Sequence, residues 1–222
     1  MDGNGRWAKL RGMARTAGHK AGTQALKKLV EYCISYEIKY LTIFSFSSEN
    51  WSRPKDEVNF ILRLMRHYVT SDLEKLNKNN VKIKIIGERD TLDRPILNLI
   101  EKAEKTTKDN TGLELIIAFN YGGRGEITSA FKKIAQNIQN GDISINDIDE
   151  DMISNSLYLP NIPDPDLILR TSGEIRFSNF LLWQSAYSEL MFIDDLWPDF
   201  NEKTFIKVLQ EFSLRQRRFG GV

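Results

Sequence analysis

Tyr40-Leu41-Thr42-Ile43-Phe44-Ser45-Phe46 is a nearly continuous apolar run that passes directly into the polar segment Ser47-Ser48-Glu49-Asn50. A short run of this kind is typical of a strand that is covered on both faces, as strands of parallel sheets are. Leu113 to Phe119 is a second such run, and Leu167-Ile168-Leu169 is a shorter third one. We therefore expect a parallel sheet at the centre of the fold.

Helix-period segments alternate with these strands along the chain. Apolar residues at helical spacing predict helices over residues 21–36, 54–77 and 91–108, from the Gly122-Gly123 turn to about residue 139, and over residues 146–158 and 202–215. Further strands are predicted at residues 81–86 and 190–193. Alternation of strands and helices is typical of βα units, so the sequence predicts an α/β protein, a single domain with a mainly parallel central sheet flanked by helices.

Composition describes an ordinary soluble globular protein. The chain has 222 residues, 41% of them hydrophobic and 27% charged, and its net charge of +1 argues against a nucleic-acid-binding protein. The single cysteine, Cys33, excludes an intrachain disulfide and favours a cytoplasmic protein. No apolar run is long enough to span a membrane, and no signal peptide is visible.

The chain opens with Asp2-Gly3-Asn4-Gly5, a glycine-rich segment that resembles a loop after a strand. Glycines let backbone amides approach a phosphate closely, and the cationic side chains that follow it, Arg6, Arg15 and His19, suit the same ligand. Because no strand precedes this segment, we expect the domain, residues 1–222, to lack its first N-terminal strand. Two alternatives for the segment are a flexible terminus and the dinucleotide fingerprint Gly3-x-Gly5-x-x-Ala8 of an NAD-dependent oxidoreductase.

Polar segments follow the predicted strands, where ligands bind in open parallel sheets. Ser47 to Pro54 follows the first strand and contains hydroxyl, amide, carboxylate and guanidinium groups. Arg170 to Ser178 follows the third strand and carries two arginines and two serines around a glycine turn, which suits a second phosphate group. Asp2 and Glu189 are the carboxylates expected to hold Mg²⁺ beside these phosphates.

Five blocks of sequence resemble the cis-prenyltransferase (isoprenyl transferase) family, and most closely its members that make undecaprenyl diphosphate. The resemblance covers the whole chain and is carried by Asp2-Gly3-Asn4-Gly5-Arg6-Trp7-Ala8 with Gly18-His19, Phe46-Ser47-Ser48-Glu49-Asn50-Trp51-x-Arg53-Pro54, Asn120-Tyr121-Gly122-Gly123-Arg124, Arg170-Thr171-x-Gly173-Glu174-x-Arg176-x-Ser178-Asn179-Phe180 with Trp183-Gln184-x-Ala186-Tyr187-x-Glu189-Leu190, and Arg217-Arg218-Phe219-Gly220-Gly221.

The resemblance implies a Mg²⁺-dependent enzyme that adds isopentenyl diphosphate repeatedly to an allylic diphosphate, usually farnesyl diphosphate. The product would be a long-chain Z-polyprenyl diphosphate, such as the undecaprenyl precursor of the carrier lipid for cell-wall synthesis. An apolar tunnel would lie beneath the active site, and the helix at residues 54–77 and the strands ending at Phe46 and Phe119 offer walls for it. Product length depends on the tunnel floor, for which Ser45 and Leu113 are candidates.

The resemblance also assigns the site residues. The allylic diphosphate would be held by Gly3, Asn4, Gly5, Arg6, Arg15, His19 and Arg53, with Trp7, Ser47, Ser48, Glu49 and Trp51 as further substrate contacts. Isopentenyl diphosphate would be held by Arg170, Arg176, Phe177 and Ser178. Asp2 and Asn50 would be catalytic, and Asp2 and Glu189 would bind the metal.

The resemblance further implies a homodimer in which Arg218-Phe219-Gly220 reaches the neighbouring site. We expect a cytoplasmic enzyme with loose contact to the membrane through its lipid product. The alternative from another class is a noncatalytic partner subunit of a prenyltransferase, although the retained Asp2, Arg6, Arg15, Arg170 and Arg176 argue against it.

Overall fold

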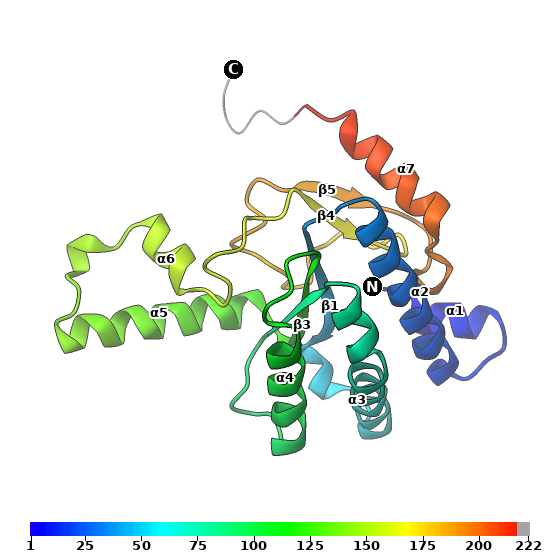
Figure 1. The fold of residues 1–222 in the computed structure, drawn as a ribbon, viewed down its shortest axis with the longest axis horizontal. Coiled ribbons are helices and arrows are strands. Elements are labelled where there is room, and N and C mark those ends of the chain that lie inside the picture. The colour runs from blue at the N-terminus through cyan, green and yellow to red at the C-terminus, as the bar shows by residue number, and fades with distance from the viewer. Residues whose placement is uncertain (217–222) are drawn as a thin grey trace.

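Two small parallel sheets form the centre of the molecule (Figure 1), in a computed structural model that describes residues 1–216. The first sheet has the order β1-β3-β2 and the second pairs β4 with β5, all in parallel. The strands are β1 (Tyr40–Ser47), β2 (Lys82–Ile86), β3 (Glu114–Tyr121), β4 (Leu167–Arg170) and β5 (Glu189–Phe192). The predicted α/β class with a parallel sheet flanked by helices is confirmed, and the strands lie within a few residues of their predicted positions.

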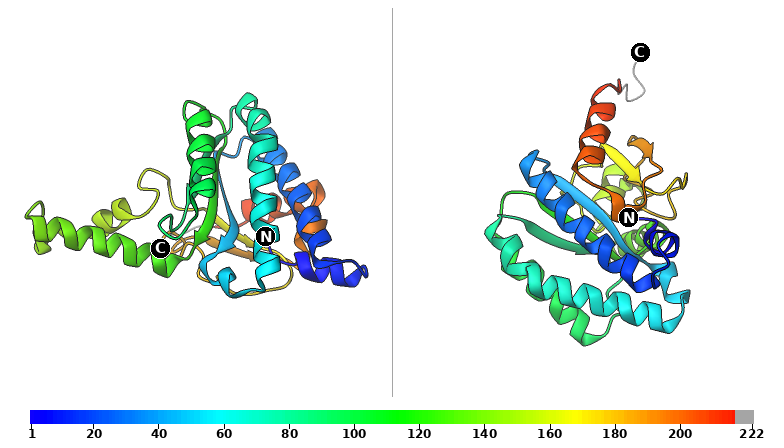
Figure 2. Two further views of the ribbon diagram at one scale, coloured as in Figure 1. Left: turned by 90° about the horizontal axis from the view of Figure 1, so that it is seen from below. Right: turned by 90° about the vertical axis from the view of Figure 1, so that its right-hand side faces the viewer.

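Three helices cover one face of the larger sheet and stand side by side (Figure 2): α2 (Arg15–Ser35), α3 (Lys55–Lys78) and α4 (Arg94–Thr107). Successive residues of a strand point to opposite faces. Leu115 and Phe119 of β3 accordingly pack with the clusters that contain these helices, whereas Ile116 and Ala118 pack with Ile168 on the other face. Burial of β3 on both faces explains why its sequence is continuously apolar.

Helices α5 (Gly123–Asn140) and α6 (Glu150–Ser156) form an arm that projects from the body of the molecule (Figures 1 and 2). The arm begins at the carboxyl end of β3, where Glu126 is buried and accepts hydrogen bonds from Tyr121 Oη at 2.6 Å and Gln184 Nε2 at 3.0 Å. The last helix, α7 (Glu202–Ser213), packs on α2.

The glycine-rich opening segment differs from the predicted loop, because it leads into a short helix, α1 (Asn4–Leu10), after only three residues. Helix α2 also begins earlier than predicted and runs through Gly18 and Gly22 without a break. A Cβ atom on Gly18 would lie 1.9 Å from the backbone oxygen of Asn4. These glycines therefore do not interrupt the helix; they let α1 approach it closely.

In the part of the chain that the structure describes, β1 and β4 do not pair with each other, and each has one free edge. Consecutive residues of both strands line one cavity that lies between them. The expectation of a further strand ahead of Met1 stays a prediction.

Candidate active site

One large cavity brings most of the predicted site residues together. Its volume is about 1830 Å³, larger than the roughly 300–1,000 Å³ of an ordinary small-molecule site. The apolar stripe of α3, which includes Ile61, Leu64, Met65 and Val69, lines it, as do residues 40–45 of β1. The stripe predicted for a core-facing helix thus faces a cavity, as a tunnel for an apolar chain requires. Ser45 lines the cavity, whereas Leu113 is buried in the core beside α2.

The backbone of the opening segment is fixed against the loop that follows β4. The Asp2 amide donates to Thr171 Oγ1 at 3.0 Å, and that hydroxyl donates to the Asp2 carbonyl at 2.8 Å. Gly3 has φ +104, and a Cβ there would lie 2.9 Å from Leu196 and 3.0 Å from Ser172. Only glycine meets both conditions without strain, so Gly3 is required for the fit between the two segments.

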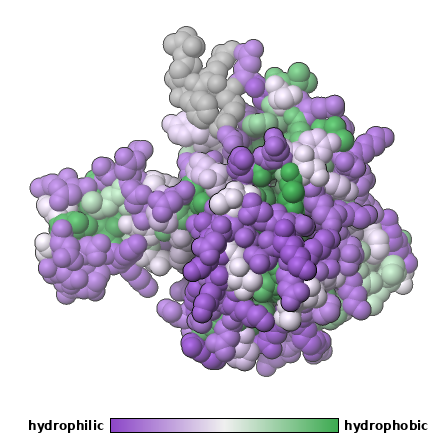
Figure 3. All heavy atoms as spheres, viewed as in Figure 1, coloured by the Kyte–Doolittle hydropathy of each residue, from purple (hydrophilic) through white to green (hydrophobic). Residues whose placement is uncertain are grey.

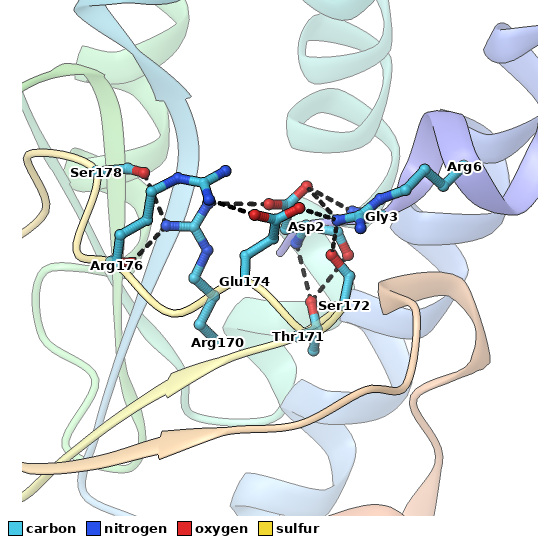
Figure 4. Close-up of polar contacts among 9 residues, drawn as sticks. All are labelled: Asp2, Gly3, Arg6, Arg170, Thr171, Ser172, Glu174, Arg176 and Ser178. Carbon is cyan, nitrogen blue, oxygen red and sulfur yellow. Dashed lines mark hydrogen bonds and ion pairs between the residues drawn. The ribbon is translucent and has the colours of Figure 1, made fainter.

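Asp2 and Arg170 form the centre of this contact (Figure 4). Arg170 Nη2 lies 3.0 Å from Asp2 Oδ2, and its Nη1 donates to Ser178 Oγ at 2.7 Å. Burial disfavours the charged form of the Asp2 carboxyl group, but hydrogen bonds from Arg170 and from the Gly3 amide outweigh it and lower its pKa. Asp2 is therefore an ionised carboxylate at neutral pH, beside the cation that the sequence assigns to a phosphate.

Glu174 links the two predicted phosphate-binding segments. Its carboxylate lies 3.0 Å from the Arg6 guanidinium of α1, and it also pairs with Arg176 of its own loop. Figure 4 shows the Glu174 carboxylate extending toward both arginines. Both arginines line the cavity and Glu174 does not, so the carboxylate offsets the repulsion between two cations without occupying the space for a ligand.

Glu57 has the same role for a second group of side chains, two arginines and a histidine. Its Oε1 lies 3.3 Å from Arg15 Nε, 3.5 Å from His19 Nε2 and 3.1 Å from Arg53 Nη1. All three partners line the cavity, whereas Glu57 lies behind them in the first turn of α3. Burial lowers the pKa of His19, which Glu57 raises and Arg15 and Arg53 lower further. His19 is therefore neutral at neutral pH.

The segment after β1 forms a short 3-10 helix, Ser48–Ser52, that reaches the same cavity. Asn50 Oδ1 accepts from the Ser47 amide at 3.2 Å, and Glu49 accepts from Asn179 Nδ2 at 2.8 Å. Trp51 lies on the other side of this segment, where its Nε1 donates to Asn120 Oδ1 at 2.7 Å. The carboxyl end of β3 thus holds the segment after β1 on the side away from the cavity.

Most predicted site residues line the cavity: Asp2, Gly3, Asn4, Gly5, Arg6, Arg15, His19, Ser47, Glu49, Asn50, Arg53, Arg170, Arg176, Phe177 and Ser178. Four do not: Trp7, Ser48, Trp51 and Glu189. Trp7 Nε1 instead donates to Asp199 Oδ1 at 2.7 Å, and Arg11 lies over its ring.

The structure does not bring Glu189 to Asp2 within one chain, contrary to the predicted pair of metal ligands. Glu189 pairs in register with Leu167 at the start of β4, whereas Asp2 contacts Arg170 at its end. Three residues of strand, about 10 Å, separate these positions. Glu189 forms an ion pair with Arg215 at 2.9 Å. In the described residues, no group of three or more acidic, histidine or cysteine side chains could hold a metal.

Sequence reasoning missed Glu57, the role of Glu174, and Asn120 as a support. The available signal for the first was that Glu57 stands four positions after Arg53, in the first turn of the helix that begins just beyond Arg53. Glu174 and Asn120 stood inside quoted motifs without a role. The predicted tail contact, Arg218-Phe219-Gly220, lies outside the described residues.

The structure argues against the dinucleotide alternative. In that fingerprint the glycines precede a helix that leads back to the next strand of the sheet. Here the helix after Gly3 ends at Leu10, and the following element is the long helix α2.

Comparisons with known proteins match one family over nearly the whole chain. Residues 1–220 match the model of the family described as "Putative undecaprenyl diphosphate synthase". An isoprenyl transferase of Rhizobium meliloti is 49% identical over 222 residues, which cover 100% of this chain and 90% of that protein. A ditrans,polycis-undecaprenyl-diphosphate synthase ((2E,6E)-farnesyl-diphosphate specific) of Micrococcus luteus is 48% identical, covering 100% of this chain and 89% of that protein.

Two solved structures have the same fold. Lavandulyl diphosphate synthase from Lavandula x intermedia, in complex with dimethylallyl diphosphate, superposes with a TM-score of 0.96 at 34% identity, covering 99% of this chain and 95% of the other. A probable undecaprenyl diphosphate synthase from Campylobacter jejuni superposes with a TM-score of 0.81 at 36% identity, covering 90% and 92% of the two chains.

Proposed function

Because the chain belongs to the undecaprenyl diphosphate synthase family of prenyltransferases, we propose that it condenses isopentenyl diphosphate repeatedly with an allylic diphosphate, farnesyl diphosphate being the expected primer. The product would be a long-chain Z-polyprenyl diphosphate such as undecaprenyl diphosphate. The observation that carries this proposal is the meeting of two cationic clusters at one large, apolar-walled cavity. Two clusters suit two diphosphates, and the cavity suits a growing hydrocarbon chain.

The first cluster is assigned to the allylic diphosphate. It consists of the backbone of Gly3, Asn4 and Gly5 with the side chains of Arg6, Arg15, His19 and Arg53. The second cluster, Arg170, Arg176 and Ser178, is assigned to isopentenyl diphosphate, with Phe177 beside it. Arg170 is held by Asp2 on one side and by Ser178 on the other, so its guanidinium is already oriented before a ligand arrives.

Asp2 fits a Mg²⁺ ion that is held mainly by phosphate oxygens. Mg²⁺ commonly takes one or two carboxylates together with substrate phosphates and water. The Asp2 carboxylate lines the cavity, is ionised and is 38% exposed, whereas Glu189 is too far away to join it in the same chain. The bound ion would neutralise charge on the departing diphosphate.

In each cycle a carbon–carbon bond forms between C4 of isopentenyl diphosphate and C1 of the allylic substrate. The allylic carbon–oxygen bond breaks, diphosphate leaves with the electron pair, and a proton is lost from C2 of the isopentenyl unit. Arg6, Arg15 and Arg53 would stabilise the charge that develops on the leaving group. Asn50 is a weak base whose Oδ1 already accepts from the Ser47 amide, so we assign it a relay toward water or diphosphate.

The test is incubation of the purified protein with farnesyl diphosphate, labelled isopentenyl diphosphate and Mg²⁺, followed by chain-length analysis of the product. We expect incorporation without any partner protein, which also excludes the noncatalytic-subunit alternative. Absence of incorporation with several allylic primers would refute the proposed function.

Asp2→Ala should lower incorporation by about a hundredfold or more, because several kcal/mol of charge stabilisation in the transition state would depend on the ion that Asp2 would hold. Asp109→Ala is the matched control, since it removes a carboxylate that is 88% exposed, lies just after α4 and does not line the cavity. Equal activity of Asp2→Ala and wild type would contradict the role of Asp2, provided that thermal denaturation shows both proteins to be folded.

A homodimer is proposed through the arm of α5 and α6. Phe131 is 68% exposed and Ile145 is 70% exposed, and Figure 3 shows hydrophobic residues gathered on this arm. Large exposed apolar side chains on a projecting element are typical of an interface between subunits.

No helix in the described residues is long and apolar enough to cross a membrane. We propose that the enzyme acts in the cytoplasm, in the synthesis of the lipid carrier for the cell wall, and contacts the membrane loosely through its lipid product.

A further inference from the structure

Asn120, the residue near the end of β3, lies outside the cavity but is connected to it. The residue is only 4% exposed, and its backbone has φ +51, in the left-handed region. Asparagine is one of the few residues other than glycine that adopt this conformation without large strain. Asn120 lies where β3, the central strand, ends, between the segments that follow β1 and β2.

The amide of Asn120 is fixed by the loop after β2. Its Nδ2 donates to the Glu88 carbonyl and to Thr91 Oγ1, each at 2.8 Å, and its own carbonyl accepts from the Glu88 amide at 3.0 Å. With both amide hydrogens engaged, the direction of Oδ1 is set. Oδ1 accepts from Trp51 Nε1 at 2.7 Å.

The indole of Trp51 is held from two sides. Asn120 binds its N–H group, and Phe46 packs edge-on against the ring with a centroid distance of 5.0 Å and an interplanar angle of 75°. Trp51 does not line the cavity, whereas Asn50 immediately before it and Arg53 shortly after it do. The indole is therefore an anchor on the far side of the segment that presents these two side chains.

We propose that Asn120 is a positioning residue that holds Trp51 and thereby sets how Ser48–Ser52 presents Asn50 and Arg53 to the allylic diphosphate. The proposal rests on the proposed function, because that function assigns Arg53 to this ligand. The first half of the segment has a separate support, the bond from Asn179 to Glu49. The Arg53 guanidinium is also held by Glu57 at 3.1 Å, so loss of the Trp51 anchor should displace mainly the backbone between Asn50 and Arg53.

Asn120→Gly is the informative substitution, because glycine keeps the left-handed backbone and removes only the amide. Trp51→Phe is its counterpart, since it keeps a ring against Phe46 and removes the N–H donor. Asn80→Gly is the matched control: Asn80 has φ +58 and its amide binds Thr111, but it lies in the turn before β2 and does not line the cavity.

The first measurement is fluorine NMR of the free protein labelled with 5-fluorotryptophan, with the Trp51 resonance assigned from its loss in Trp51→Phe. The chain has four tryptophans, so the signals of Trp7, Trp183 and Trp197 serve as internal controls. We expect Asn120→Gly to move the Trp51 resonance and leave the other three in place, and Asn80→Gly to move none. An unchanged Trp51 resonance in folded Asn120→Gly overturns the proposal.

The second measurement is a double-mutant cycle on steady-state kinetics. Asn120→Gly and Trp51→Phe should each raise KM for the allylic diphosphate by about three- to tenfold, the effect of one neutral hydrogen bond, with a smaller change in kcat. The double variant should have a KM no higher than that of the single variant with the larger increase, because both changes remove the same bond. Additive effects would mean that Asn120 does not act through Trp51.

If Asn120→Gly does not fold, Thr91→Val decides, since it loosens the Asn120 amide without altering Asn120 itself. A shifted Trp51 resonance then supports the proposal, and an unshifted one overturns it. The NMR readout needs no turnover. A wild-type protein without prenyl transfer would refute the proposed function, whereas an active wild type with an unmoved Trp51 in the variants would refute only the role of Asn120.

Discussion

At the scale of single residues, the site is built from cations that each have a carboxylate behind or beside them. Glu57 contacts Arg15, Arg53 and the neutral His19, and Glu174 contacts Arg6 and Arg176. Like charges so close together would repel strongly in a partly buried site, and the carboxylates offset this repulsion. The cations can therefore be arranged before the ligand binds, which lowers the cost of orienting them at that moment.

His19 makes the stability of the protein depend on pH in a defined direction. Burial lowers its pKa below the ordinary value of 6.5, with Arg15 and Arg53 acting in the same sense and Glu57 against them. The folded protein thus binds fewer protons than the unfolded chain just below pH 6.5, so acid favours unfolding. The stabilising contribution is present above pH 6.5 and is lost as the pH falls toward the lowered pKa.

His19→Gln should therefore reduce the loss of unfolding free energy between pH 7 and pH 5, by about 1.4 kcal/mol for each unit of pKa shift that is removed. Urea denaturation at a series of pH values measures this slope. His67→Gln is the control, because His67 lies on an exposed part of α3. A slope that is the same in wild type and His19→Gln would contradict the prediction.

At the scale of elements, the close contact between α1 and α2 positions the opening segment. Gly18 of α2 touches the backbone of Asn4, and a Cβ on Gly22 would lie 2.1 Å from Asn4 Oδ1. The two glycines are one helical turn apart and so face α1 together. The glycines of α2 thereby fix α1, and with it Arg6, beside the cavity.

Gly18→Ala should destabilise the protein by about 1–3 kcal/mol or more, because the added methyl group overlaps the Asn4 carbonyl and α1 must move. Gly125→Ala in α5 is the matched control, since a Cβ there meets nothing within 4 Å. In that open helical position alanine should instead stabilise by about 0.5–1 kcal/mol. Chemical denaturation of both variants gives the sign of each change in the free energy of unfolding. Stabilisation by Gly18→Ala would disprove the close contact.

The carboxyl end of β3 shows how one element acts on another without touching the ligand. Asn120 of β3 binds Trp51 of the segment after β1, and the amide of Gly123, the first residue of α5, donates to the Asn179 carbonyl at 2.7 Å. The end of the central strand thus supports two segments that line the cavity, the one after β1 and the one after β4.

At the scale of the whole molecule, two features dominate: the cavity, which β1, β4 and α3 help to line, and the arm, which projects from the body of the molecule in Figure 1. The cavity combines a charged region with an apolar wall from α3, which suits a substrate that has a diphosphate head and a hydrocarbon chain. The arm exposes apolar side chains that the fold of a single chain does not cover.

Phe131→Asp should convert the proposed dimer into a monomer, because a charge on the buried part of an interface is costly. Size-exclusion chromatography with light scattering measures the mass directly. Lys133→Asp is the control, since a residue two positions further along α5 lies on nearly the opposite side of the helix. A wild-type monomer, or a Phe131→Asp protein that remains dimeric, would contradict the proposed arm interface.

Much of this protein could be predicted from its sequence, because the relevant signals are local. Strands such as Leu113 to Phe119 show themselves by residue type, and helices such as α4 by apolar spacing. The segments at the carboxyl ends of β1 and β4 could be assigned to a site because parallel strands bring such ends to one edge. Those segments do line the cavity, together with the opening segment.

Other features depended on contacts between distant parts of the chain, which leave no periodic pattern in the sequence. Glu189 has the residue type of a metal ligand, but the strand register places it at the far end of β4 from Asp2. Trp51 has the residue type of a ligand contact, but Asn120, 69 positions away, turns it into an anchor. The sequence predicted a helix only from residue 21, beyond Gly18, and only the proximity of α1 explains a glycine inside α2. Residue type and spacing thus determined the elements and the chemistry, whereas tertiary packing decided which side chains meet, because each meeting depends on two segments at once.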